Sequence, residues 1–98
     1  MGDITVTFFD NVKIALRINH DKLDTEIQAT IDSAKAEMER AGIVKSTILD
    51  TDKLVATAIK TYCQYMFASD DKVKEGYFIS WSYQLDNLRK SKNYGYEV

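Results

Sequence analysis

The sequence predicts an all-α protein, a small bundle of about four helices with a mobile C-terminal tail. The 98 residues contain no proline, a residue that helix interiors exclude, although average usage would give about five. Apolar residues recur at three- and four-residue steps along most of the chain. Gly42, Gly76 and Gly95 separate the periodic blocks. A chain of this length supports a single domain, here residues 1–98, with one modest core.

The first helix is predicted over residues 8–18, where Phe9, Val12 and Leu16 form an apolar stripe. Thr7 and Asp10 have the spacing of a capping box at its start. Residues 4–7 alternate like a short strand, but a strand without a partner is unstable, so we expect an extended lead-in.

The second helix, predicted over residues 22–41, has the clearest pattern. Residues 19–21 (Asn-His-Asp) offer capping side chains before it, and Gly42 directly after it suits a left-handed C-terminal cap. Its apolar stripe follows 4-4-3-4-3 spacing and consists of Leu23, Ile27, Ile31, Ala34, Met38 and Ala41.

The third helix is predicted over residues 52–67, after a connection (residues 43–50) whose four apolar residues, Ile43, Val44, Ile48 and Leu49, we expect against the core. The Asp-Thr-Asp sequence at 50–52 suits its N-terminus. Its apolar face is unusually broad. That breadth indicates either a central helix covered on several sides or a helix divided between core and partner interface.

The fourth helix is predicted over residues 77–90, on the 3-4-3 spacing of Phe78, Trp81, Leu85 and Leu88. Capping residues occur at 69–71, and residues 72–76 leave room for one further turn. Residues 91–98 have no periodicity, and we expect them to be mobile in the free protein.

The sequence indicates no enzyme, and it predicts no catalytic residue, cofactor or metal. His20 is the only histidine, and its place beside Asp21 fits a capping loop. Cys63 lies within the apolar pattern and is expected to be a buried residue with no chemical role. One His and one Cys cannot form a zinc tetrad, and no glycine-rich phosphate loop occurs. A thiol-dependent enzyme using Cys63 is the weaker alternative.

Charge and cysteine content narrow the protein class further. Thirteen basic and 15 acidic residues give a net charge of −2, which is unlike a basic nucleic-acid-binding protein. One unpaired cysteine fits a reducing cytosolic environment. No apolar stretch approaches the ~18 residues that cross a bilayer, so no membrane role is expected.

The aromatic residues suggest a protein interface. Tyrosine and tryptophan are enriched in interfaces, and here most of them follow residue 60. We prefer a core position for Tyr62, Phe78 and Trp81, and an interface position for Tyr94 and Tyr96. The full set of candidate interface residues is Tyr65, Phe67, Trp81, Arg89, Lys90, Tyr94 and Tyr96.

Several segments in order resemble a known family. Residues 12–18 (VKIALRI) precede an acidic DKLD at 21–24, and a long helix of the form Ile27-x-x-x-Ile31-x-x-Ala34-Lys35-x-x-Met38 then ends at Ala41-Gly42. This resembles the head–tail connector proteins of tailed bacteriophages and prophages. Residues 58–63 (AIKTYC) and 83–94 resemble the subgroup from Gram-positive hosts. The sequence departs from the family at residues 43–50, which lack the proline of many members, and at residues 64–67 (QYMF).

The resemblance implies a small helical subunit that assembles as a ring of about a dozen copies below the portal. Such a ring extends the DNA channel and docks the tail. The implied partners are other copies of the chain, the portal protein, tail or head-closure proteins, and DNA that passes without sequence-specific binding. The implied location is the head–tail junction of the virion, after synthesis in the bacterial host cytoplasm.

A small helical cytosolic adaptor or DNA-binding regulator is the alternative function. No predicted helix carries the cluster of Arg, Lys, Asn and Gln that a recognition helix needs. Within the connector interpretation, we expect the broad third helix and the aromatic-basic C-terminal segment to supply the contact faces.

Overall fold

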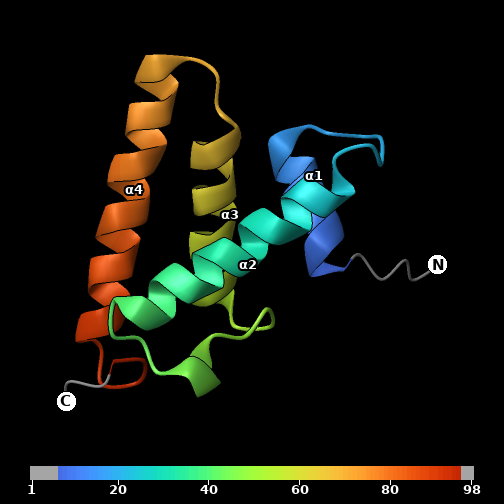
Figure 1. Cartoon of the computed structure of the whole chain (residues 1–98). Helices are drawn as coiled ribbons and strands as arrows, with labels where there is room; N and C mark the ends of the chain where they lie inside the picture. Colours follow the sequence, from blue (N-terminus) through green and yellow to red (C-terminus); the bar gives the residue numbers. More distant parts are fainter. Residues whose placement is uncertain (1–6, 96–98) are drawn as a thin grey trace.

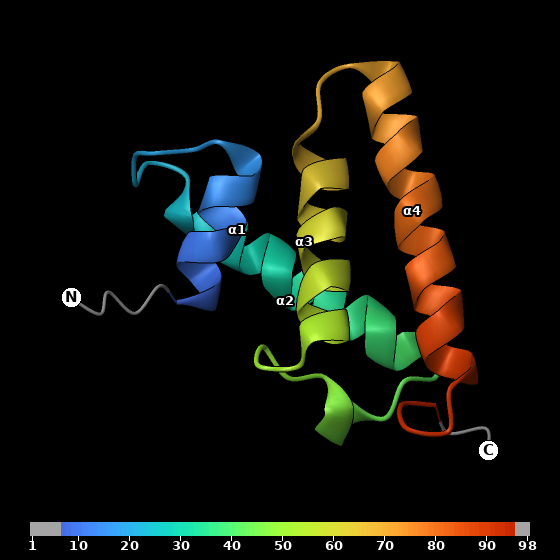
Figure 2. The same cartoon turned by 180° about the vertical axis from the view of Figure 1, so that it is seen from behind.

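The computed structural model describes residues 7–95, which form four α-helices and one short 3₁₀ turn. The helices are α1 (Phe8–Leu16), α2 (Asp24–Arg40), α3 (Lys53–Phe67) and α4 (Asp71–Lys90), and the turn is η1 (Lys45–Thr47). Helices α3 and α4 form a hairpin, α2 crosses one side of it, and α1 packs beside α3 (Figures 1 and 2). The molecule is a slab, 42 × 38 × 21 Å, with α1 and α4 at opposite edges. The predicted all-α bundle of four helices is confirmed.

Helix α1 starts as predicted and ends earlier. The Thr7 hydroxyl accepts a hydrogen bond from the Asp10 N–H at 3.1 Å, so Thr7 caps the helix. The helix ends at Leu16 rather than at residue 18, because Arg17 adopts the left-handed conformation with φ 60°. The Arg17 N–H then turns back to donate to the carbonyl of Ile14.

The start of α2 corrects the predicted cap at residues 19–21. The helix begins at Asp24, and the residue at its N-cap, Leu23, makes no side-chain cap hydrogen bond. The Lys22 N–H donates instead to Nδ1 of His20, which makes His20 part of a tight turn. Asp24 pairs with Lys13 of α1 at 2.7 Å, and this contact fastens the start of α2 to the preceding helix.

The end of α2 is confirmed in detail as a glycine cap. Gly42 has φ +106°, and its N–H donates to the Glu39 carbonyl, while the Ile43 N–H donates to the Met38 carbonyl, both at 3.1 Å. This pair of bonds is a Schellman motif. Met38 and Ile43 are both fully buried, which supplies the apolar contact that accompanies the motif.

The connection to α3 buries only some of its apolar residues. Ile43 is buried and Ile48 packs against the core, but Leu49 is 52% exposed, so its predicted core position is wrong. After the η1 turn, Ile48 and Leu49 are consecutive, and only the first faces the interior.

Aspartates cap both helices of the hairpin. Asp52 accepts from the N–H groups of Leu54 and Val55 at 2.9 and 3.1 Å, and Asp70 caps α4 with the same geometry. Because Asp70 provides this start, α4 begins at Asp71, six residues before the predicted residue 77, and it runs through Gly76 without a break. Gly76 is therefore not the helix boundary that the sequence predicted.

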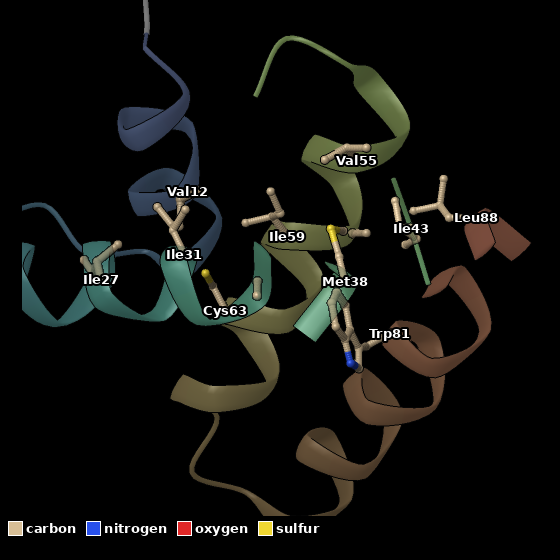
Figure 3. Close-up of a cluster of buried hydrophobic side chains, with 12 residues drawn as sticks. Val12, Ile27, Ile31, Met38, Ile43, Val55, Ile59, Cys63, Trp81 and Leu88 are labelled. Carbon is tan, nitrogen blue, oxygen red and sulfur yellow. The ribbon is translucent and has the colours of Figure 1, made fainter. Parts of the chain in front are cut away.

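The core lies around α3, which contacts each of the other three helices. Figure 3 shows Ile59 and Cys63 of α3 facing Ile31 and Met38 of α2, with Trp81 of α4 at the far side. The buried cluster comprises Val12, Ile27, Ile31, Ala34, Met38, Ile43, Val55, Ala58, Ile59, Cys63, Trp81 and Leu88.

The C-terminal segment is tied to the bundle over residues 91–95. The Val44 N–H donates to the Tyr94 carbonyl at 2.6 Å, and the Tyr94 hydroxyl donates to Oδ2 of Asp52 at 2.9 Å. Gly95 closes a turn on the Ser91 carbonyl, and a Cβ at this position would collide with the backbone at the end of α4. Residues 91–95 were predicted to be mobile, and this prediction is corrected: their sequence has no periodicity, yet they form a hydrogen-bonded turn. Residues 96–98 lie outside the described residues.

Gly76→Ala should stabilise the protein by about 0.5–1 kcal/mol, because the added methyl group meets open space and alanine favours the helix. The measurement is the free energy of unfolding in urea. Gly42→Ala is the matched control, and it should destabilise by about 1 kcal/mol or more because of the φ of +106°. A loss of stability in Gly76→Ala would mean that α4 is interrupted at this position.

Candidate assembly surfaces

The groups that could support catalysis are spread out or inert. Cys63 is buried, and burial raises the pKa of its thiol from 9.0 to about 12. His20 is engaged in its turn. Over residues 7–95, no group of three or more His, Cys, Asp or Glu side chains could hold a metal ion. None of the helices described is long and apolar enough to cross a membrane.

The free end of the hairpin carries an aromatic cluster. The rings of Tyr65 (α3) and Phe78 (α4) lie 5.2 Å apart, and Nζ of Lys74 is 5.2 Å from the centre of the Tyr65 ring. Phe67, at the end of α3, packs at the edge of the core. Phe78 is 48% exposed, so the preferred core position for it is wrong: its ring packs on Tyr65 at the surface, outside the buried cluster.

Trp81 lies in the core, as the sequence analysis preferred, although it was also a candidate interface residue. Its side chain is 5% exposed and packs on Tyr62 with ring centres 4.8 Å apart.

The opposite end of the hairpin is basic and hydrogen-bonded. Arg89 and Lys90 are exposed and pair with Asp86 at 2.9 and 3.0 Å. The hydrogen bond from Lys90, followed by the charges of Lys90 and Arg89, lowers the pKa of Asp86. Tyr94 lies beside this end, and Tyr96 lies outside the described residues. Apart from Trp81, which lies in the core, the structure thus divides the described candidate residues between the two ends of the hairpin rather than joining them in one site.

A groove of about 280 Å³ separates α3 from the last turns of α4. Gln84 reaches across to α3, where its Nε2 donates to the Thr61 hydroxyl at 3.2 Å. Its Oε1 is buried and has no hydrogen-bond partner among residues 7–95. The groove is lined by Leu54, Thr57, Gln84, Asn87, Leu88, Ser91 and Tyr94.

The Asp52–Tyr94 hydrogen bond, which we call the clasp, links the start of α3 to the C-terminal segment. The N–H of Val55 is the main cause that lowers the pKa of Asp52, and the Tyr94 hydroxyl lowers it further. The same contact raises the pKa of Tyr94, because its hydroxyl proton is held by the carboxylate.

Sequence analysis missed the exposed apolar residues on the outer faces of the first and last helices. Ile14 is 67% exposed on α1, and Ile79 and Tyr83 are 60% and 70% exposed on α4. The sequence did contain a signal for them, because each is an apolar residue whose position in the helical repeat lies outside the buried stripe of its own helix.

Comparison with known proteins relates the chain to a described family. Residues 8–91 match the model of a family described as phage connector protein. No curated protein and no solved structure matches the chain. The matched range contains all four helices and both ends of the hairpin.

The Cys63 thiol should react only after unfolding. Alkylation at pH 8 is expected to be roughly a thousandfold slower in the native protein than in denaturant, because a pKa of about 12 instead of 9.0 leaves so little thiolate. Equal alkylation rates in the native protein and in denaturant would support the alternative function, a thiol-dependent enzyme that uses Cys63.

Tyr94→Phe should release the clasp while keeping the ring. The free energy of unfolding is expected to fall by about 0.5–1 kcal/mol, and the Val44 amide should exchange its hydrogen faster, since the Tyr94 carbonyl protects it. Tyr83→Phe is the control, because no hydrogen bond engages the Tyr83 hydroxyl within residues 7–95. Unchanged exchange at Val44 in Tyr94→Phe would contradict the clasp.

The difference in the free energy of unfolding between wild type and Tyr94→Phe is expected to depend on pH. A carboxyl group whose pKa is lowered by folding stabilises the protein above its unfolded pKa, here 3.8, and the contribution disappears as the pH falls through the folded value. The difference between wild type and Tyr94→Phe should therefore shrink below pH 3.8 and be constant from pH ~5 up to the ordinary tyrosine pKa of 10.0, above which the raised pKa of Tyr94 makes it shrink again.

Proposed function

The chain belongs to the phage connector protein family, a family of structural phage proteins, and from this membership we propose that it is the connector between the head and the tail of a tailed phage. The single observation that carries the proposal is the family match over residues 8–91. An all-α fold without clustered catalytic groups among residues 7–95 agrees with a structural role. The proposed location is the head–tail junction of the virion, after synthesis in the cytoplasm of the host, which we propose to be Gram-positive.

The proposed assembly is a ring of about a dozen copies below the portal, around the path of the DNA. The net charge of −2 supports passage of DNA, since a strongly basic lumen would make phosphate contacts that retain it. DNA would then pass without sequence-specific binding.

The two ends of the hairpin are the proposed docking sites for the portal and for tail or head-closure proteins. The aromatic cluster with Tyr65 and Phe67 lies at one end, and Arg89, Lys90 and Tyr94 lie at the other. Trp81, between them, is 5% exposed and would contribute only through that small part of its surface, and Tyr96 follows directly after Gly95 in sequence. A subunit with different contact groups at its two ends can join two different structures along one axis.

Co-sedimentation tests the connector role directly. The purified chain should sediment with DNA-filled capsids that carry a portal and should remain in the supernatant with capsids that lack one. Equal recovery from both would overturn the proposal, and sequence-specific duplex binding in a low-salt gel shift would favour the regulator instead.

Arg89→Ala combined with Lys90→Ala should lower recovery on portal-bearing capsids roughly tenfold, the effect of losing an important interface contact. Both residues are exposed at a helix end, so the fold should be retained. Arg40→Ala is the matched control, because Arg40 forms the same type of i,i+3 ion pair with Glu37 on α2. Full recovery of the double variant on portal-bearing capsids would mean that Arg89 and Lys90 do not form part of a docking site.

A further inference from the structure

The outer faces of α1 and α4 are exposed apolar surfaces at opposite edges of the slab. Ile14 lies on the side of α1 opposite the buried Val12, and Ile79 and Tyr83 lie on the side of α4 opposite the buried Trp81. Helix α3 separates the two edges (Figures 1 and 2), so one chain cannot join them.

The outer face of α4 has the form of a hole for a side chain. Gly76, Ile79, Ser80 and Tyr83 occupy positions i, i+3, i+4 and i+7, the four positions that surround an inserted knob in helix packing. Gly76 leaves the hole open at one corner, because nothing lies within 4 Å of the position where its Cβ would be. A glycine inside a helix costs about 0.5–1 kcal/mol, and a knob packed into this hole would explain why that cost is tolerated.

The outer face of α1 has the matching knob. Ile14 is an exposed β-branched side chain, with Asp10 one turn before it and Arg17 about one turn after it. On α4 the hole has the Tyr83 hydroxyl towards one end and Glu75 towards the other. Within residues 7–95, none of these four polar side chains makes a hydrogen bond or an ion pair.

Charge selects an antiparallel arrangement of knob and hole. With Ile14 at the centre of the hole, Asp10 lies about 6 Å along the axis, and the backbone of Arg17, the left-handed residue that ends α1, lies about 4.5 Å in the other direction. Antiparallel packing then brings Asp10 to the Tyr83 hydroxyl and places the backbone of Arg17 at the level of Glu75, while it keeps Asp10 away from Glu75. Parallel packing would instead bring Asp10 to Glu75, and like charges repel.

The orientation of the helices agrees with this choice. In Figure 1 α1 runs upwards and α4 runs downwards, so two copies placed side by side in the same orientation present antiparallel helices to each other. We propose that α1 of one copy packs on α4 of the next copy, with Ile14 inserted between Gly76, Ile79, Ser80 and Tyr83. The contact is heterologous and can repeat around a ring, and in this respect it rests on the proposed connector function.

The contact is weak for an isolated pair. One helix packed on another buries less than the ~1,200 Å² of typical stable interfaces, and closure of the ring supplies the remaining stability. A covalent trap therefore suits the test better than a measurement of the oligomeric state.

Disulfide trapping between single-cysteine chains tests the contact. Arg17→Cys and Glu75→Cys, each made with Cys63→Ala, retain the knob and the hole. In an oxidised mixture the heterodimer should form roughly tenfold faster than either homodimer, because the contact raises the local thiol concentration. Lys45→Cys, which replaces another exposed basic residue, is the control in place of Arg17→Cys. Homodimers, or the Lys45 pair, forming equally fast would overturn the inference.

Filling the hole provides an independent readout. Gly76→Gln in the Glu75→Cys chain adds a helix-favouring side chain, so the fold should be retained or stabilised while heterodimer formation slows roughly fivefold or more. Ser33→Gln, at an exposed position of α2, should leave the rate unchanged. An unchanged rate in Gly76→Gln would overturn the assigned hole.

The two proposals fail in different ways. If trapping fails while the wild-type chain still sediments with portal-bearing capsids, the α1–α4 contact is wrong and the connector role is supported. If trapping succeeds but the chain binds no capsid, the contact is supported and the connector role is overturned.

Discussion

The packing of three helices around α3 is the constraint on which the rest of the structure depends. A helix contacted on several sides must be apolar around most of its circumference, and the 15 residues of α3 include only two charged side chains. Thr61 and Tyr62 meet Gln84 and Trp81 of α4, while Ile59 and Cys63 face α2. The other helices each bury one face against α3, which leaves the outer faces of α1 and α4 without a partner among residues 7–95.

The two ends of the α3–α4 hairpin differ in how firmly they are held. At one end, the cap of Asp52, the Schellman motif after α2 and the C-terminal turn are connected through Val44 and Tyr94. At the other end, Tyr65 and Phe78 pack on each other, and Phe78 is half exposed. A rigid end and an exposed aromatic end suit a subunit that lies between two larger structures.

Stability and assembly make opposite demands at Gly76. Alanine would favour the helix, yet the open corner that glycine leaves is the feature that accommodates a neighbour's side chain in the proposed contact. In the proposed assembly, the two edges therefore contact copies of the same chain, and the two ends contact different proteins. This division follows from a thin slab with its central helix covered.

Local patterns in the sequence were enough to determine the helical class, the bounds of α3 within one residue, and the caps at Asp52, Asp70 and Gly42, because each depends on residues within a few positions. The resemblance to phage connectors also came from local segments, and the family match bears it out. Tertiary structure decided the rest. Tyr94 is held because Asp52, 42 positions away, accepts a hydrogen bond from its hydroxyl. Trp81 packs on Tyr62 in the core, whereas Phe78, on the same stripe of α4, is half exposed. Ile14 and Gly76 became candidate interface residues only once α1 and α4 were placed at opposite edges. The periodicity within one helix cannot specify which partner its outer face contacts, because the position of that face in the molecule is set by the packing of the other helices.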